Sequence, residues 1–197
     1  MLVDTREAIR ATFMRMYMCE RLDRITVKGL CAAAPVARTT FYAHYRNVDD
    51  VLAEVEDGLL AGLAEVTERV SGGDLPNMDF STFLDETLGF IRERWTDFYA
   101  LLVARPDMRF IARWKVAVKS NFARRYPKAR MRQNWDLIAE MGASATIGAY
   151  TWWMEHPDAP GIDAVKGQVE RPSQRSLRPS RHSWKSPNTF ASRVVFA

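Results

Sequence analysis

Apolar residues recur at intervals of three and four along most of the chain, the spacing that gathers them on one face of an α-helix. β-branched residues are scattered, and no Asn-Gly or Asp-Gly dipeptide lies between the alternating runs that would mark a β-hairpin. The 197 residues are enough to bury a substantial core, as one domain or as two small ones. We therefore predict an all-α fold.

The first fifty residues predict three short helices and the start of a longer one. Asp4, Thr26 and Asn47 have the short polar side chains that cap helix N-termini. Pro35 ends the second helix, because proline cannot continue a helix beyond its first turn. The expected helices cover residues 5–20, 27–34 and 38–45, followed by a long helix that begins after Asn47.

Glycine and proline in SGGDLPNM, residues 71–78, predict an interruption after the long helix. Further helices are expected from residue 80 onward with a kink near Thr96, and then at 107–125 and 130–155. From Arg171 the chain is rich in Arg, Ser and Pro and has no helical period. These changes divide the chain into a three-helix head, a larger helical domain and a tail, at residues 1–46, 47–170 and 171–197.

The end of the chain is strongly basic. Residues 164–197 contain seven Lys or Arg and one acid, Glu170. Such a segment is either a disordered or non-native tail, or a basic arm that contacts nucleic acid.

Basic and acidic residues are unevenly distributed where the head meets the long helix. Residues 1–46 contain eight Lys or Arg and four Asp or Glu, whereas residues 47–70 contain one and seven. This separation suits two solvated helix faces, and it equally suits a head that binds a polyanion beside a helix that repels it. Charge alone leaves both interpretations open.

The segment ITVKGLCAAAPVARTTFYAHYRN, residues 25–47, has the composition of a helix-turn-helix: a supporting helix, a short turn and a polar second helix. Arg38 and Thr39 suit base edges, because arginine can fork onto guanine and a threonine methyl can contact thymine. Hydroxyl and guanidinium groups suited to phosphates belong to Thr40, Tyr42, Tyr45 and Arg46. The alternative is that these polar residues form only a solvent-exposed face on a helical core.

This segment resembles the DNA-binding head of the TetR (tetracycline repressor) family of bacterial transcriptional regulators. The resemblance is carried by ITVKGLC, RTTFYAHY and DDVL, and it extends from Thr5 to about Leu60. From MDFSTFLDETLGFIRERWTDFYALLV to GASATIGAYTWWMEH the chain also looks like the helical regulatory domain of one branch of that family.

The resemblance implies a homodimeric regulator, most often a repressor, that places one recognition helix per subunit in the major groove of a pseudo-palindromic double-stranded DNA operator. It further implies that residues 47–170 form a regulatory and dimerisation domain, where a small-molecule effector binds and releases the DNA. By position, the DNA-facing surface of the family corresponds to Thr26, Arg38, Thr39, Thr40, Tyr42, His44 and Arg46.

Three features depart from the family pattern. Pro35 occupies a turn position that is usually glycine, and proline cannot adopt positive φ without strain. Ala37 replaces the usual capping serine or asparagine, a loss of about 1 kcal/mol. Only GIDAVKGQVE, residues 161–170, precedes the tail where the last helix of a dimer bundle is expected. A helical, dimeric interaction module with weakened or lost operator binding is therefore the alternative function.

The larger domain is rich in aromatic residues, which either form its core or line an apolar ligand pocket. Trp95, Tyr99 and Trp114 are the candidates for the pocket, since the resemblance places them on segments around the family's cavity. Trp152, Trp153 and Ile147 are expected to face the partner subunit. Small residues in GASATIGA would allow close packing of helices.

Catalysis is not expected. The three histidines lie far apart at positions 44, 156 and 182, and no metal-binding, phosphate-loop or nucleophile motif is present. We therefore expect no catalytic residue, metal or cofactor. The two cysteines, Cys19 and Cys31, lie in apolar stretches, and the N-terminal residues form neither a signal peptide nor a membrane span. A cytoplasmic protein with no membrane partner follows as an expectation.

Overall fold

The computed structural model describes residues 5–72, 80–127, 133–156 and 158. These residues form helices and connecting turns and contain no strand, which confirms the predicted all-α fold. The elements, in chain order, are α1 (Thr5–Cys19), the 3-10 turn η1 (Leu22–Arg24), α2 (Val27–Ala33), α3 (Arg38–Tyr42), α4 (Val48–Ser71), α5 (Phe80–Glu93), α6 (Trp95–Tyr99), the π-helical turn η3 (Ala100–Ala104), α7 (Met108–Arg125) and α8 (Trp135–Glu155).

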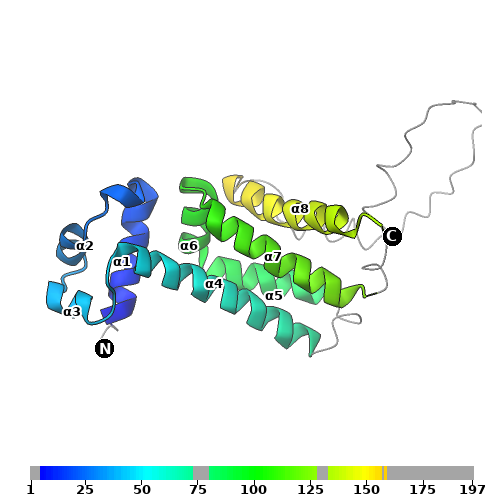
Figure 1. Cartoon of the computed structure of the whole chain (residues 1–197), viewed down its shortest axis with the longest axis horizontal. Coiled ribbons are helices and arrows are strands. Elements are labelled where there is room, and N and C mark those ends of the chain that lie inside the picture. The colour runs from blue at the N-terminus through cyan, green and yellow to red at the C-terminus, as the bar shows by residue number, and fades with distance from the viewer. Residues whose placement is uncertain (1–4, 73–79, 128–132, 157, 159–197) are drawn as a thin grey trace, which may run out of the picture.

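The first three helices form a head at one end of an elongated molecule (Figure 1). Helix α4 begins at the head and runs along the body, where it packs against α5 and α7. Helix α8 lies on α7 at the far side from α4 (Figure 1). The long helix is therefore the element that the head and the body share.

The ends of α4 follow from local chemistry. The Asn47 side chain accepts a hydrogen bond from the Asp50 backbone N–H at 3.0 Å, which confirms the predicted N-cap. Asp49 and Asp50 lie in the first turn, where carboxylates favour the positive end of the helix dipole. Gly72 ends the helix with a φ of 54°, a left-handed conformation that glycine adopts without steric penalty.

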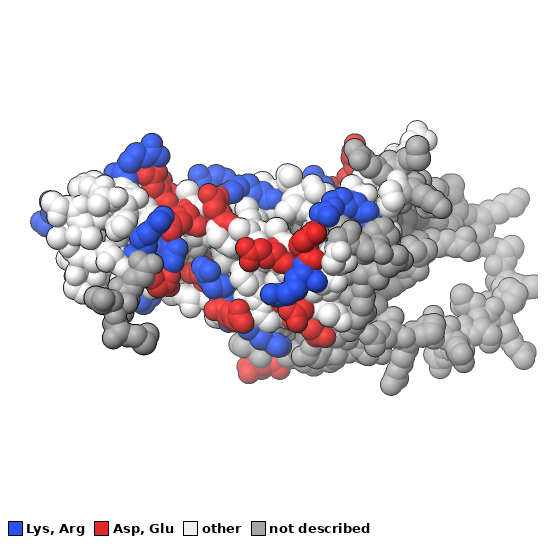
Figure 2. Space-filling model, turned by 90° about the horizontal axis from the view of Figure 1, so that it is seen from below, with Lys and Arg blue, Asp and Glu red and all other residues white. Residues whose placement is uncertain are grey.

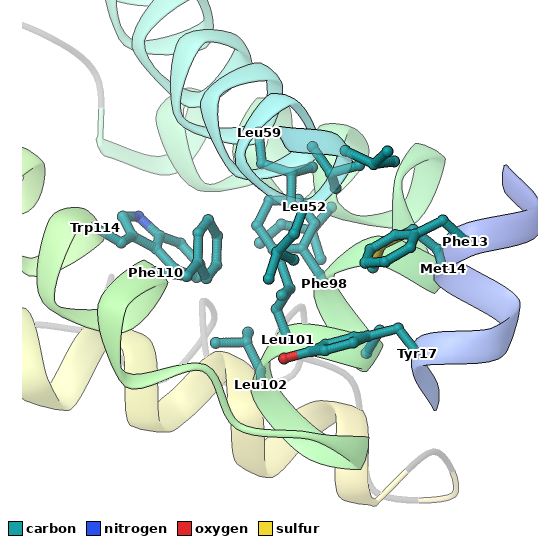
Figure 3. Packing of buried hydrophobic residues seen from close by; sticks show 14 of the residues in the cluster. Phe13, Met14, Tyr17, Leu52, Leu59, Phe98, Leu101, Leu102, Phe110 and Trp114 are labelled. Atoms are coloured by element: carbon teal, nitrogen blue, oxygen red, sulfur yellow. The ribbon is translucent and has the colours of Figure 1, made fainter. Parts of the chain in front are cut away.

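The hydrophobic core continues from the head into the body. Figure 3 shows Phe13 and Met14 of α1 directed toward Leu52 of α4 and Phe98 of α6, and all four side chains are almost completely buried. The same cluster extends to Phe110 and the other buried residues of the body. The core thus crosses the expected boundary at residue 46.

The predicted kink is present just before Thr96. Helix α5 ends at Glu93, and α6 begins at Trp95. The following turn, η3, is π-helical, with the Arg105 N–H donating to the Ala100 carbonyl at 2.9 Å. Its residues Ala100 to Leu102 are buried and contact α1, so this irregular turn lies at the junction of head and body.

Some predicted helix ends differ from the observed ones. The third helix was expected to reach Tyr45, but α3 ends at Tyr42 and a turn follows, in which the Tyr45 N–H donates to the Phe41 carbonyl. The last helix begins at Trp135 within the described residues, and residues 128–132 lie outside them. The Asp4 cap, the linker residues 73–79 and the tail also lie outside the described residues. No helix of the described segments is long and apolar enough to cross a bilayer.

Candidate nucleic-acid interface and body cavity

The head has the arrangement of a helix-turn-helix. Helices α2 and α3 are joined by four residues, 34–37, and pack on each other, and α2 also packs on α1. Leu30 of α2 and Phe41 of α3 are completely buried, and they meet Ile9 and Phe13 of α1 in the head core. Because Phe41 anchors the inner side of α3, the remaining side chains of that short helix point outward.

The outer side of α3 is polar and exposed. Arg38, Thr39 and His44 are exposed, Thr40 is half-buried, and Tyr42 retains 57% of its surface. Arg38 has no ion-pair partner among the described residues, so its guanidinium is available to an external group. The structure therefore brings four of these predicted residues together on α3, and His44 lies in the turn that follows it.

Thr26 has a structural role at the start of α2. Its Oγ1 accepts a hydrogen bond from the Gly29 N–H at 3.0 Å, which confirms the predicted N-cap. The residue is exposed, and its hydroxyl can still donate to a phosphate while it accepts from the backbone.

The prediction that Tyr45 contacts phosphates is wrong. Tyr45 retains only 3% of its surface, because its ring packs against Phe41 at 5.6 Å between centroids and under the Arg6 guanidinium at 5.8 Å. The alternation of exposed and buried positions around residues 38–45 is helical, and Tyr45 lies on the same side as Phe41. It is a core residue of the head.

Arg46 is exposed but already engaged. Its Nε and Nη2 donate to the two carboxylate oxygens of Asp50, each at 2.9 Å. Hydrogen bonding to Asp50 raises the pKa of Arg46, and the same bonds lower the pKa of Asp50. Arg46 can therefore reach a phosphate only by sharing or leaving this pair.

The turn between α2 and α3 carries both departures seen in the sequence. Pro35 has a φ of 25°, far from the value near −65° that its ring prefers, so the backbone is strained there. Ala37 is the N-cap of α3 and has no side chain that can cap it. Helix α3 thus starts from a strained turn and an uncapped helix end.

Lys28 is an exposed basic residue of the head that is not among the residues predicted to contact DNA. It lies on the exposed side of α2, two residues after the Thr26 cap, and forms no ion pair among the described residues. Its position on the supporting helix suits a phosphate contact. Periodicity alone could have indicated it, since Leu30 and Cys31 occupy the buried side of α2.

Two acidic residues of α4, Glu54 and Glu56, are paired with arginines of neighbouring helices. Glu54 accepts from Arg6 at 2.6 Å and from Arg10 at 2.7 Å, which joins α4 to α1. Glu56 is completely buried and accepts from Arg109 at 2.8 Å and Arg113 at 3.0 Å, which joins α4 to α7. Figure 2 accordingly shows acidic and basic side chains interleaved along this face of the body.

A cavity of about 630 Å³ lies between α4, α5, α7 and α8. This volume is within the range of small-molecule sites. Its wall is mainly apolar, and it contains the aromatic residues Phe83, Trp114, Phe122, Tyr126, Tyr150, Trp152 and Trp153.

Of the three residues predicted for a pocket, the structure places only Trp114 in the wall of this cavity. Trp95 and Tyr99 lie outside it, which corrects that part of the prediction. The two rings stack on each other at 6.3 Å, and Trp95 also packs edge-on against Trp153 at 5.2 Å. The break before α6 rotates these residues away from the cavity and into inter-helix packing.

The expectation for the partner-facing residues also needs correction. Ile147 and Trp153 are buried within the chain, at 4% and 9% exposure, so they cannot contact a partner. Trp152 is 52% exposed and shares one face of α8 with the exposed residues Leu137 and Met141. That face is the apolar surface of α8.

No protein-family model matches the chain, and no curated protein sequence matches it. Among solved structures, the chain is similar to one described as the dihydroxyacetone kinase operon activator DhaS, with a TM-score of 0.52. The match covers 83% of this chain and 90% of the DhaS chain at 13% sequence identity. At this identity the similarity shows a TetR-like all-helical fold.

Proposed function

We propose that the protein is a ligand-responsive transcriptional regulator that binds double-stranded DNA as a homodimer, with no catalytic activity of its own. The observation that carries the proposal is the exposed polar side of α3, held in place by the buried Phe41. It is supported by a fold similar to that of a protein described as an operon activator. We further propose that it acts as a repressor on a pseudo-palindromic operator.

In this proposal α3 enters the major groove. Arg38 and Thr39 at its start contact base edges, where a guanidinium can fork onto guanine. Tyr42 and Thr40 contribute hydroxyls to phosphates, and Lys28 contributes a charge from the supporting helix. Phosphate contacts fix the position of the head, and Arg38 supplies sequence preference.

Dimer formation uses the apolar surface of α8. Leu137, Met141 and Trp152 are each more than half exposed and lie along one side of that helix. Exposed apolar residues arranged in a stripe are typical of helix-helix interfaces. Sedimentation should detect a dimer at micromolar concentration, and Leu137→Glu should shift it toward monomer.

The effector site is the cavity of the body. Helix α4 contributes Leu60, Leu63 and Thr67 to its wall, and the same helix is joined to the head through Glu54. A ligand that changes the position of α4 therefore also changes the position of α3. Release of DNA requires a difference in ligand affinity between the DNA-bound and free conformations.

Fluorescence titration tests operator binding with a duplex from the promoter region next to the gene and with a scrambled duplex. Affinity should favour the promoter duplex and fall steeply with salt, because bound cations are released from the DNA. Arg38→Gln should lower affinity and relax base preference by about 1–3 kcal/mol at the contacted pair. Tyr42→Phe should weaken binding to all duplexes alike.

The matched control is Arg69→Gln, which removes the same charge at the opposite end of α4, where Arg69 pairs with Glu86. That end lies about 35 Å from Arg46, at a rise of about 1.5 Å per residue. Arg69→Gln should leave specific binding intact. If Arg38→Gln and Tyr42→Phe bind the promoter duplex like the parent, the assignment of α3 is refuted.

The second candidate function is a helical interaction module that has lost operator binding. The strained Pro35 and the uncapped Ala37 favour it, because both weaken the element that would contact DNA. Equal affinity for promoter and scrambled duplexes at every salt concentration would support this alternative.

A further inference from the structure

The cavity is bounded by flat aromatic surfaces. Trp114 of α7 and Tyr150 of α8 stack with their rings 8° from parallel and 5.8 Å between centroids. Phe122, Trp152 and Trp153 contribute further rings to the wall. Planar walls favour a planar ligand, because ring stacking is best where both partners are flat.

Charged side chains are scarce among the described residues of the wall, which favours an uncharged ligand. Among the described residues that line the cavity, Arg125 alone is charged, and it is engaged with Tyr126: its Nε donates to the phenol oxygen at 3.1 Å. No acid lines the cavity within the described residues, so a cationic ligand has no counter-charge. Burial raises the pKa of Tyr150 to about 12, so this ring remains an uncharged phenol at neutral pH.

The hydroxyl groups of the wall differ in their hydrogen bonding. Thr67 donates to the Leu63 carbonyl at 2.9 Å, and Thr146 donates to the Gly142 carbonyl at 2.9 Å. Thr87 of α5 is 3% exposed, and its hydroxyl has no hydrogen-bond partner among the described residues. A buried hydroxyl without a partner is unfavourable, so Thr87 has an uncommitted donor in the wall of a mainly apolar cavity.

We propose that the cavity binds an uncharged, flat, multi-ring molecule that carries a carbonyl or hydroxyl oxygen, and that the Thr87 hydroxyl donates a hydrogen bond to that oxygen. Rotation about the Cα–Cβ bond of Thr87 to another staggered position moves its hydroxyl and brings the donor to the ligand. The role of this ligand as an effector rests on the proposed function. Its binding requires only the cavity.

The test uses three probes of similar shape on the full chain without DNA. Flavone is a flat three-ring ketone, 2-phenylnaphthalene has three rings and no oxygen, and flavone-8-carboxylate adds a negative charge. Dissociation constants come from quenching of tryptophan fluorescence, since Trp114, Trp152 and Trp153 line the cavity. We expect flavone to bind about 2- to 10-fold more tightly than 2-phenylnaphthalene, which corresponds to one hydrogen bond.

Thr87→Val should remove this preference and leave the affinity for 2-phenylnaphthalene unchanged. Thr87→Ser, which keeps the hydroxyl, should retain the preference. Thr146→Val is the matched control, because it removes a wall hydroxyl that already donates to the backbone, and it should keep the preference for flavone. The ratio of two affinities on one sample is independent of any loss of folded protein.

The proposal is overturned if flavone-8-carboxylate binds most tightly, if no probe binds, or if Thr87→Val keeps the preference for flavone. Binding is measured without DNA, so a failure of operator binding would leave its outcome unchanged. Addition of flavone to a protein–duplex complex then tests the effector role separately: dissociation supports that role, and an unchanged complex refutes it for this probe.

Discussion

Helices α4 and α5 pack closely where the Phe90 ring of α5 lies over Gly62 of α4. A Cβ atom placed on Gly62 would lie 2.2 Å from the Phe90 Cζ and 2.6 Å from its Cε2. Carbon atoms in contact are normally about 3.5–4.0 Å apart, so the ring would have to move by more than about 1 Å. Phe90 itself packs edge-on against the fully buried Phe98, which limits that movement.

Gly58, one turn earlier on α4, is the control, because a Cβ there meets nothing within 4 Å. Gly58→Ala should stabilise the protein by about 0.8–1 kcal/mol through helix propensity alone. Gly62→Ala gains the same propensity but adds overpacking of about 1–3 kcal/mol. Propensity cancels between the two variants, so Gly62→Ala should be less stable than Gly58→Ala by about 1–3 kcal/mol.

Urea unfolding followed by circular dichroism at 222 nm measures this difference, with all variants at one protein concentration because a dimer is expected. Equal slopes with a lower midpoint for Gly62→Ala would agree with a clash in the folded state. If both alanine variants are equally stable, α5 does not pack on α4 at Gly62 in the way described, and the position of the cavity wall formed by these helices is wrong.

Three further perturbations test other parts of the molecule. Pro35→Gly should stabilise the head by about 1 kcal/mol in urea unfolding, since relief of about 1–3 kcal/mol of backbone strain exceeds the added entropy of the unfolded chain. Ala37→Ser should add about 1 kcal/mol by capping α3, and it should strengthen specific binding in a duplex titration. Lys119 and Lys115 hold the pKa of Glu140 at about 2, below its ordinary 4.5, so the stabilisation from this carboxylate is present above pH 4.5 and is lost as pH falls toward 2. Glu140→Gln should therefore show a flatter dependence of the urea midpoint on pH in that window.

Local features were predictable from the sequence because local chemistry determines them. Asn47 and Thr26 cap the helices that follow them. Such a cap joins a short polar side chain to the backbone N–H three residues later in the chain, so it depends only on neighbouring residues. Asp107 likewise caps α7 by accepting from the N–H groups of Arg109 and Phe110. These are positions where two or three neighbouring residues suffice to fix the structure.

The direction in which an individual side chain points was not predictable, because it depends on contacts with segments that are distant in the sequence. Tyr45 has a polar hydroxyl and follows an exposed helix, yet its ring lies in the head core under Arg6 of α1. Trp95 lies on a helix next to the cavity, but the break at Arg94 turns it toward Trp153. The spacing from Phe41 agrees with the buried side for Tyr45, but Arg6 lies 39 residues from Tyr45 and Trp153 lies 58 residues from Trp95, so neither contact is visible in the local pattern.

The acidic residues of α4 show that the burial of a charged side chain also depends on distant residues. Glu56 is one of seven acidic residues among residues 47–70, and the acidic composition of this segment suggests a solvent-exposed helix face. It is completely buried because Arg109 and Arg113, more than fifty residues away, place two guanidiniums on its carboxylate. Hydrogen bonding to Glu56 raises the pKa of Arg109, as expected for a cation that a buried carboxylate holds. A buried carboxylate is compatible with folding when both of its oxygens are paired in this way.

These pairs divide α4 into two functional halves. Its N-terminal half is held by Arg10 of α1 through Glu54 and by Arg113 of α7 through Glu56, while its C-terminal half, including Leu63 and Thr67, forms the cavity wall. A helix of 24 residues is a stiff rod of about 36 Å, so a displacement at the cavity is transmitted along its length and is not absorbed locally. Under the proposed function, the buried Glu56 carboxylate would act as the pivot, because its pairs with Arg109 and Arg113 attach α4 to α7 between the cavity half and the head half of the helix. In that proposal, the movement of α3 would depend on where this attachment lies along the helix as well as on how far the ligand displaces its end.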